Sequence, residues 1–170
     1  MMLKEKIQQD FKNALKRKQE VETSTLRMLK AAVFNKEKEK RYKLVKEKPD
    51  LEEKELEKES QLTDEEIIEV ISSEIKRRKE AILEFEKGKR KDLAKKEKAE
   101  MKILQNYLPE QLSEEGIKKL ANESIKKVGA KDIKDMGKVM KEVNAKIAGR
   151  ADGKLISDLV KQRLSGQSPL

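Results

Sequence analysis

The sequence has no cysteine and no histidine, and aromatic residues make up only 3% of its 170 residues. Without cysteine the chain can form no disulfide, carries no thiol nucleophile and cannot build a thiolate metal site. Without histidine it lacks the commonest general base, the usual catalytic triads and the commonest zinc ligand. The composition therefore predicts no catalytic residue, no cofactor and no metal site.

Long apolar runs are absent as well. No stretch of the sequence approaches the roughly 18 apolar residues that cross a membrane. The N-terminus shows a helical pattern with Asp10 inside it, which is unlike the apolar core of a signal peptide. We therefore expect no membrane contact and a cytoplasmic location.

Charged residues are abundant: 44% of the chain is charged, and the net charge is +9. The commonest residues include Lys, Glu, Leu, Ala and Ile, most of which favour helices, and no stretch alternates apolar and polar residues with the period of a strand. The sequence therefore predicts an all-α fold.

Apolar spacing predicts an N-terminal helical domain over 1–108 with four helices. We expect a turn at 20–23, with Thr23 or Ser24 capping the helix that follows. The highly charged segment at about 42–62 predicts a frayed helical extension and a mobile connection. Thr63 and Glu66 then form a capping box that opens a strong helix, and Gly88 occupies its C-cap position.

Pro109 marks the expected boundary with a second domain, over 109–170, in which three amphipathic helices form a small bundle. Ser113 is placed to cap the first of these helices, and Gly129 to end it. Asp152 is placed to cap the last one.

The string Gly149–Lys154 is the first candidate site. Arg150 and Lys154 flank a helix N-terminus, where free amides and the helix dipole favour an anion such as phosphate. Capping by Gly149 and Asp152 explains the same string without a ligand, so both interpretations stay open. The glycine spacing does not match a nucleotide-binding P-loop.

Two basic runs are further candidates. The run 76–79 is typical of a solvated helix face, because four consecutive helical residues spread around more than half of the circumference. The run 87–91 surrounds a turn, so its cations should converge on one place: Lys87, Lys89, Arg90 and Lys91. Aromatic residues are too few to predict stacking on bases, and Tyr107 is more typical of a core residue.

Several strings resemble the YqeY-like family. The string 106–115 resembles the hinge of that family, 24–29 and 74–79 resemble its N-terminal helices, and 128–130, 135–140 and 149–154 resemble its C-terminal unit. That unit is similar to the tail domain of GatB, a component of the glutamyl/aspartyl-tRNA amidotransferase. The resemblance implies a four-helix unit followed by a three-helix tail that helps to hold tRNA, with Lys138 joining Arg150 and Lys154 as contacts.

The resemblance leaves three functions open. The chain is first expected to be a tRNA-binding accessory module without catalysis of its own. Alternatively, it is a component of a glutamine-dependent tRNA amidotransferase assembly, which the carbon–nitrogen ligase label of the family would describe. The third hypothesis is a helical adaptor that binds proteins and no RNA. The expected partners are tRNA and an amidotransferase or tRNA synthetase.

Overall fold

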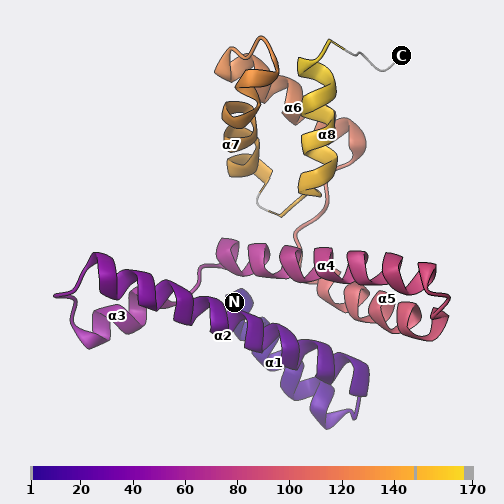
Figure 1. Cartoon of the computed structure of the whole chain (residues 1–170). Coiled ribbons are helices and arrows are strands. Elements are labelled where there is room, and N and C mark those ends of the chain that lie inside the picture. Colours follow the sequence, from indigo (N-terminus) through magenta and orange to yellow (C-terminus); the bar gives the residue numbers. More distant parts are fainter. Residues whose placement is uncertain (1, 148, 167–170) are drawn as a thin grey trace. The chain divides into compact units, whose positions relative to one another are not determined.

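A computed structural model describes residues 2–147 and 149–166. All regular elements within these residues are helices, and no strand occurs among them (Figure 1). The all-α prediction is therefore confirmed. The chain divides into two compact units, 1–108 and 109–170, each with its own apolar core.

The described part of the first unit contains five α-helices, one more than the sequence analysis expected. Their bounds are α1 Leu3–Lys16, α2 Glu20–Glu47, α3 Glu53–Ser60, α4 Asp64–Lys87 and α5 Lys91–Gln105. The additional helix is α3, which lies in the segment expected to be a mobile connection at about 42–62. The first part of that segment, up to Glu47, continues α2.

The helix α3 packs against α2, and the apolar side chains of Leu56 and Leu62 are buried. Leu56 on α3 and Leu62 just after it are only 7% and 8% exposed. Exposed ion pairs also join Arg41 of α2 to Glu53, and Lys48, just after α2, to Glu59. A helix with so little apolar surface depends on such tertiary contacts, which local periodicity does not reveal.

The turn between α1 and α2 comes earlier than expected. Lys18 adopts the left-handed conformation with φ 55°, and the amide of Gln19 donates to the carbonyl of Ala14 at 3.0 Å. This tight turn lets α2 begin at Glu20, so the prediction of a cap at Thr23 or Ser24 is wrong. Thr25, inside the helix, donates its hydroxyl to the carbonyl of Val21 at 2.7 Å.

The capping box at the start of α4 is confirmed. The amide of Glu66 donates to the hydroxyl of Thr63 at 3.2 Å, and the amide of Thr63 donates to the carboxylate of Glu66 at 2.8 Å. The helices α4 and α5 pack against each other along their length. The core of this unit consists of Ile7, Leu26, Leu29, Val33, Leu62, Ile67, Ile71, Ile75, Leu104 and Tyr107.

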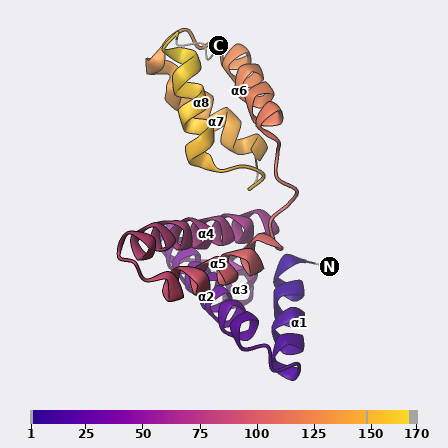
Figure 2. The ribbon, with the colours of Figure 1, turned by 90° about the vertical axis from the view of Figure 1, so that its right-hand side faces the viewer.

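In the described part of the second unit, three α-helices pack around a separate core (Figure 2). Their bounds are α6 Glu114–Val128, α7 Met136–Ile147 and α8 Gly153–Leu164, with a short 3-10 helix, η1, at Ile133–Asp135. Ser113 caps α6, Gly129 ends α6 in the left-handed conformation with φ 65°, and Asp152 caps α8. These three terminal residues were all predicted from the sequence.

Among the described residues, no helix combines the length and the apolar character that crossing a bilayer requires.

Candidate nucleic-acid interface

The turn between α7 and α8 presents two cations to solvent. Arg150 and Lys154 are both exposed. The backbone of this turn is held to the start of the unit: the amide of Leu112 donates to the carbonyl of Arg150 at 2.7 Å, and the side chain of Gln111 donates to the carbonyl of Gly149 at 2.9 Å. The backbone at Arg150 is therefore held in place by hydrogen bonds.

Asp152 limits what the N-terminus of α8 can bind. Its carboxylate accepts a hydrogen bond of 2.9 Å from the amide of Lys154, which is one of the amides that an anion would otherwise use. At least one amide of this helix end is therefore already occupied, and the side chains of Arg150 and Lys154 are the exposed groups that remain beside it. Neither side chain forms an ion pair with a described residue; Arg150 donates only a long hydrogen bond, 3.4 Å, to the carbonyl of Glu110.

Lys138 differs from these two cations. Its ammonium lies 2.9 Å from the carboxylate of Asp135, three residues earlier. This hydrogen bond raises the pKa of Lys138 and lowers the pKa of Asp135. Because Asp135 already balances its charge, Lys138 is a weaker partner for phosphate than an unpaired lysine.

The other four candidate cations lie at the turn between α4 and α5, and all four are exposed. Gly88 stands at the C-cap of α4 as predicted, but with φ −76°; the left-handed residue is Lys89, with φ 58°. The amide of Arg90 then donates back to the carbonyl of Phe85 at 2.8 Å, which closes the turn. The basic run is thus folded around a tight helix end.

Two of these four cations have carboxylate partners. Lys87 lies 2.7 Å from Glu84, and Arg90 makes two hydrogen bonds, of 3.2 and 3.1 Å, to Asp92. The hydrogen bonds from Arg90 lower the pKa of Asp92. Lys89 and Lys91 have no such partner among the described residues.

The structure therefore sorts the seven predicted cations into two classes. Lys87, Arg90 and Lys138 are paired with carboxylates, whereas Lys89, Lys91, Arg150 and Lys154 are not. The unpaired ones form two groups, one in each unit.

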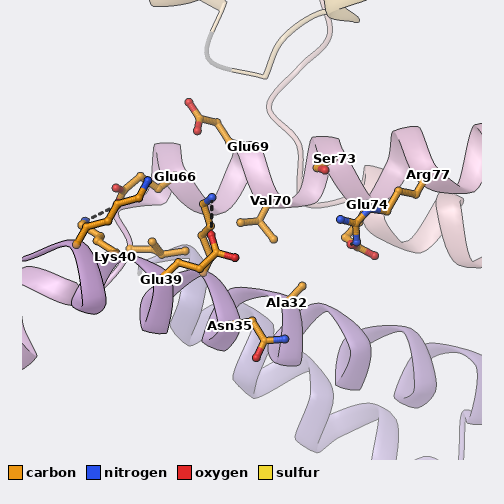
Figure 3. A pocket seen from close by; sticks show the side chains of 13 residues that line it. Ala32, Asn35, Glu39, Lys40, Glu66, Glu69, Val70, Ser73, Glu74 and Arg77 are labelled. Atoms are coloured by element: carbon orange, nitrogen blue, oxygen red, sulfur yellow. Dashed lines mark hydrogen bonds and ion pairs between the residues drawn. The ribbon is translucent and has the colours of Figure 1, made fainter.

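An open groove of about 640 Å³, which local sequence patterns do not predict, lies between α2 and α4 (Figure 3). Its lining is electrostatically balanced, with four cations and four carboxylates: Lys36, Lys40, Lys43, Arg77, Glu39, Glu66, Glu69 and Glu74. The two signs neutralise each other, so the groove offers phosphate no net attraction.

Glu66 illustrates this balance, because it faces Lys40 across the groove at 2.7 Å (Figure 3). Burial raises the pKa of Glu66, but hydrogen bonds from Lys40 and Thr63 outweigh burial and lower the pKa overall.

The basic run 76–79 also conceals a buried group. Arg78 is only 5% exposed and lies between Glu74 at 2.9 Å and Glu100 at 3.1 Å, with Glu97 at 3.9 Å. The interpretation of this run as a solvated face is therefore wrong at Arg78. The spacing of Glu74 and Arg78, four residues apart on a helix, was the available signal.

The chain is similar to a known protein family and to a curated protein. A family model described as Yqey-like protein matches residues 4–50 and 48–164 of the chain. An uncharacterized protein of Schizosaccharomyces pombe is 43% identical over 51 residues, which are 30% of this chain and 42% of the yeast protein. This match thus spans less than half of the length of the yeast protein.

Proposed function

The chain belongs to the YqeY-like family, and we propose that it is a tRNA-binding accessory module that contacts RNA through two groups of exposed cations. One observation carries this proposal. Lys89 and Lys91 in the first unit, and Arg150 and Lys154 in the second, are exposed and unpaired with carboxylates of the described residues. In a chain of net charge +9, such cations are the groups available to phosphate.

The choice of tRNA rests on the resemblance of the C-terminal strings to the amidotransferase tail. Arg150 lies in the turn before α8 and Lys154 in the first turn of α8, and both side chains are exposed. The proposal assigns the chain RNA binding and no reaction. The same resemblance supports a second candidate, in which the chain is a component of a glutamine-dependent amidotransferase assembly whose other components supply the chemistry.

The test is a set of tRNA binding curves at several salt concentrations. We expect the double variant Arg150→Ala/Lys154→Ala to weaken binding by about 1–3 kcal/mol. The negative slope of log K against log salt should become shallower by about two units. The variant Lys89→Ala/Lys91→Ala should act in the same direction. Circular dichroism checks that helix content is unchanged in both variants.

The matched control removes two paired cations, as Lys87→Ala/Lys138→Ala. It changes the net charge by the same amount, but each lysine already has a carboxylate within 2.9 Å. Its effect on affinity and on the salt slope should be clearly smaller. If all three double variants lose affinity equally, binding follows net charge alone; if none loses affinity, the proposed RNA surface is wrong.

A further inference from the structure

The helix α2 is apolar on two opposite sides, and only one side is covered. Leu26, Leu29 and Val33 point into the core of the first unit and are at most 5% exposed. On the other side, Phe34 and Tyr42 are 54% and 63% exposed. Large apolar groups that stand in water along one helix indicate a surface that another molecule covers.

The exposed residues form a continuous line. Six residues follow one another along α2 at intervals of three or four, the spacing of a single helix face: Arg27, Ala31, Phe34, Lys38, Tyr42 and Val45. We call these six residues the outer stripe. All six are exposed. At 1.5 Å per residue the outer stripe is about 27 Å long, which matches a partner helix of about five turns.

The outer stripe carries positive charge and no carboxylate. Its charged members are Arg27 and Lys38, and Lys46 lies beside Tyr42. The nearest acidic residues on α2 face elsewhere: Glu37 pairs with Lys4 of α1, and Glu39 lines the groove toward α4. Glu53 of α3 pairs with Arg41 beside the outer stripe, so the cations left for a partner are Arg27, Lys38 and Lys46. Charge complementarity with these three cations favours an acidic partner over a second copy of this surface.

Two lysines favour a protein partner over RNA bases. Lys38 lies over the ring of Phe34 at 4.6 Å, and Lys46 over the ring of Tyr42 at 4.4 Å. A nucleobase stacks on a free ring face, and in each ring a lysine occupies one face.

We propose that the outer stripe of α2 binds an acidic amphipathic helix of a partner protein. Apolar residues of that helix pack against Ala31, Phe34, Tyr42 and Val45, and its flanking carboxylates pair with Arg27, Lys38 and Lys46. The mode is that of an amphipathic helix that packs along one face of another helix, with charges that select the partner. It is independent of the RNA contacts proposed above, which use other residues.

The test uses the full chain and a fluorescein-labelled three-heptad peptide with Leu at the seam positions and Glu at the flanking positions. A twin peptide carries Lys in place of Glu. Fluorescence anisotropy should show binding of the acidic peptide and not of its twin. The variant Phe34→Ser/Tyr42→Ser should raise the Kd at least tenfold without changing the net charge.

A matched control removes two apolar residues that are equally exposed elsewhere, as Leu15→Ser/Leu83→Ser. These leucines are 54% and 57% exposed, and neither lies on α2. The control should leave the Kd within twofold. The charge reversal Lys38→Glu/Lys46→Glu should make the chain prefer the twin peptide, and circular dichroism should show unchanged helicity in every variant.

Three outcomes would overturn the proposal. The first is an acidic peptide that fails to bind, or that binds equally to both serine variants. The second is a dimer in sedimentation that Phe34→Ser/Tyr42→Ser dissociates, since the occupant is then a second copy. The third is an oligouridine whose binding depends on the outer stripe while peptide binding does not, since the occupant is then RNA.

Discussion

The hydroxyl of Tyr107 donates a hydrogen bond of 2.8 Å to the carboxylate of Asp10, 97 positions earlier in the chain. Tyr107 follows α5 and is 7% exposed, and the ammonium of Lys6 lies 5.4 Å from its ring. The two residues tie the first helix of the unit to the end of the last one. The prediction that Tyr107 belongs to the core is confirmed.

This contact predicts a loss of stability at alkaline pH. Burial and the hydrogen bond to Asp10 raise the pKa of Tyr107 above its ordinary value of 10.0. Above about pH 10 the unfolded chain therefore loses the phenolic proton while the folded chain keeps it, and the free energy of unfolding falls. Below that pH, Tyr107→Phe should cost about 1–2 kcal/mol through the lost hydrogen bond.

Urea unfolding of the wild type and Tyr107→Phe between pH 7 and pH 11 measures both effects. The variant lacks the phenol, so the stability difference between the two proteins should shrink as the pH rises past 10. Lysine deprotonation affects both proteins alike and cancels in this difference. Two curves that stay parallel over the whole range would contradict the prediction.

The buried ion pairs of Arg78 predict a large effect of a single substitution. Arg78→Ala leaves the carboxylates of Glu74 and Glu100, which are 9% and 4% exposed, without their shared cation. Breaking a buried pair in this way costs about 3–5 kcal/mol. Arg77 supplies the control, because its side chain is 74% exposed. Arg77→Ala should change the free energy of unfolding by less than about 1 kcal/mol in the same urea experiment.

Contacts between residues close in sequence could be predicted, whereas contacts between residues far apart in sequence could not. Asp152 caps α8 by bonding an amide two residues on, and Thr63 with Glu66 closes a box within three residues, so local spacing identified both. Arg78 and Glu100 are 22 residues apart, and their contact depends on how α4 and α5 pack. The packing of α3 on α2 is equally non-local, so local spacing predicts neither contact.

The same limit applies to the candidate interface. The sequence identified the basic runs, but pairing decides which cations remain available to a ligand. Arg90 with Asp92 could be anticipated from their spacing of two residues. The outer stripe of α2 could not, because the 3.6-residue period of α2 serves two opposite faces and only the tertiary packing shows which one is buried.

Backbone conformation gives a pair of opposite predictions. Gly129 and Lys18 both end helices in the left-handed region, with φ 65° and 55°. Gly129→Ala should destabilise the second unit by about 1 kcal/mol through backbone strain. No steric clash adds to this cost, because an added Cβ meets nothing within 4 Å. Lys18→Gly should stabilise the first unit by about 0.5–1 kcal/mol. Urea unfolding of each variant checks the signs, and two shifts in the same direction would contradict this explanation.

Composition predicts that the isolated chain catalyses no amidation. It contains no histidine and no cysteine, and it shows no nucleophile motif. Purified protein incubated with glutamine, ATP and mischarged tRNA should form no amidated tRNA above a blank without protein. The matching positive control is a complete amidotransferase under the same conditions. Turnover by the chain alone would overturn this prediction.

The segment before α6 should decide whether the second unit folds alone. Leu112 packs against the core of that unit, its amide bonds the carbonyl of Arg150 at 2.7 Å, and Ser113 caps α6. A fragment of residues 109–170 retains all of these contacts and should unfold cooperatively. A fragment of residues 114–170 lacks them and should be less stable by about 2 kcal/mol, from the lost cap and the lost leucine.

Thermal unfolding followed by circular dichroism compares the two fragments, and equal stability would show that the segment before α6 contributes nothing to the unit. A helical but non-cooperative longer fragment would mean that the second unit needs the first, because about 60 residues are marginal for an independent core.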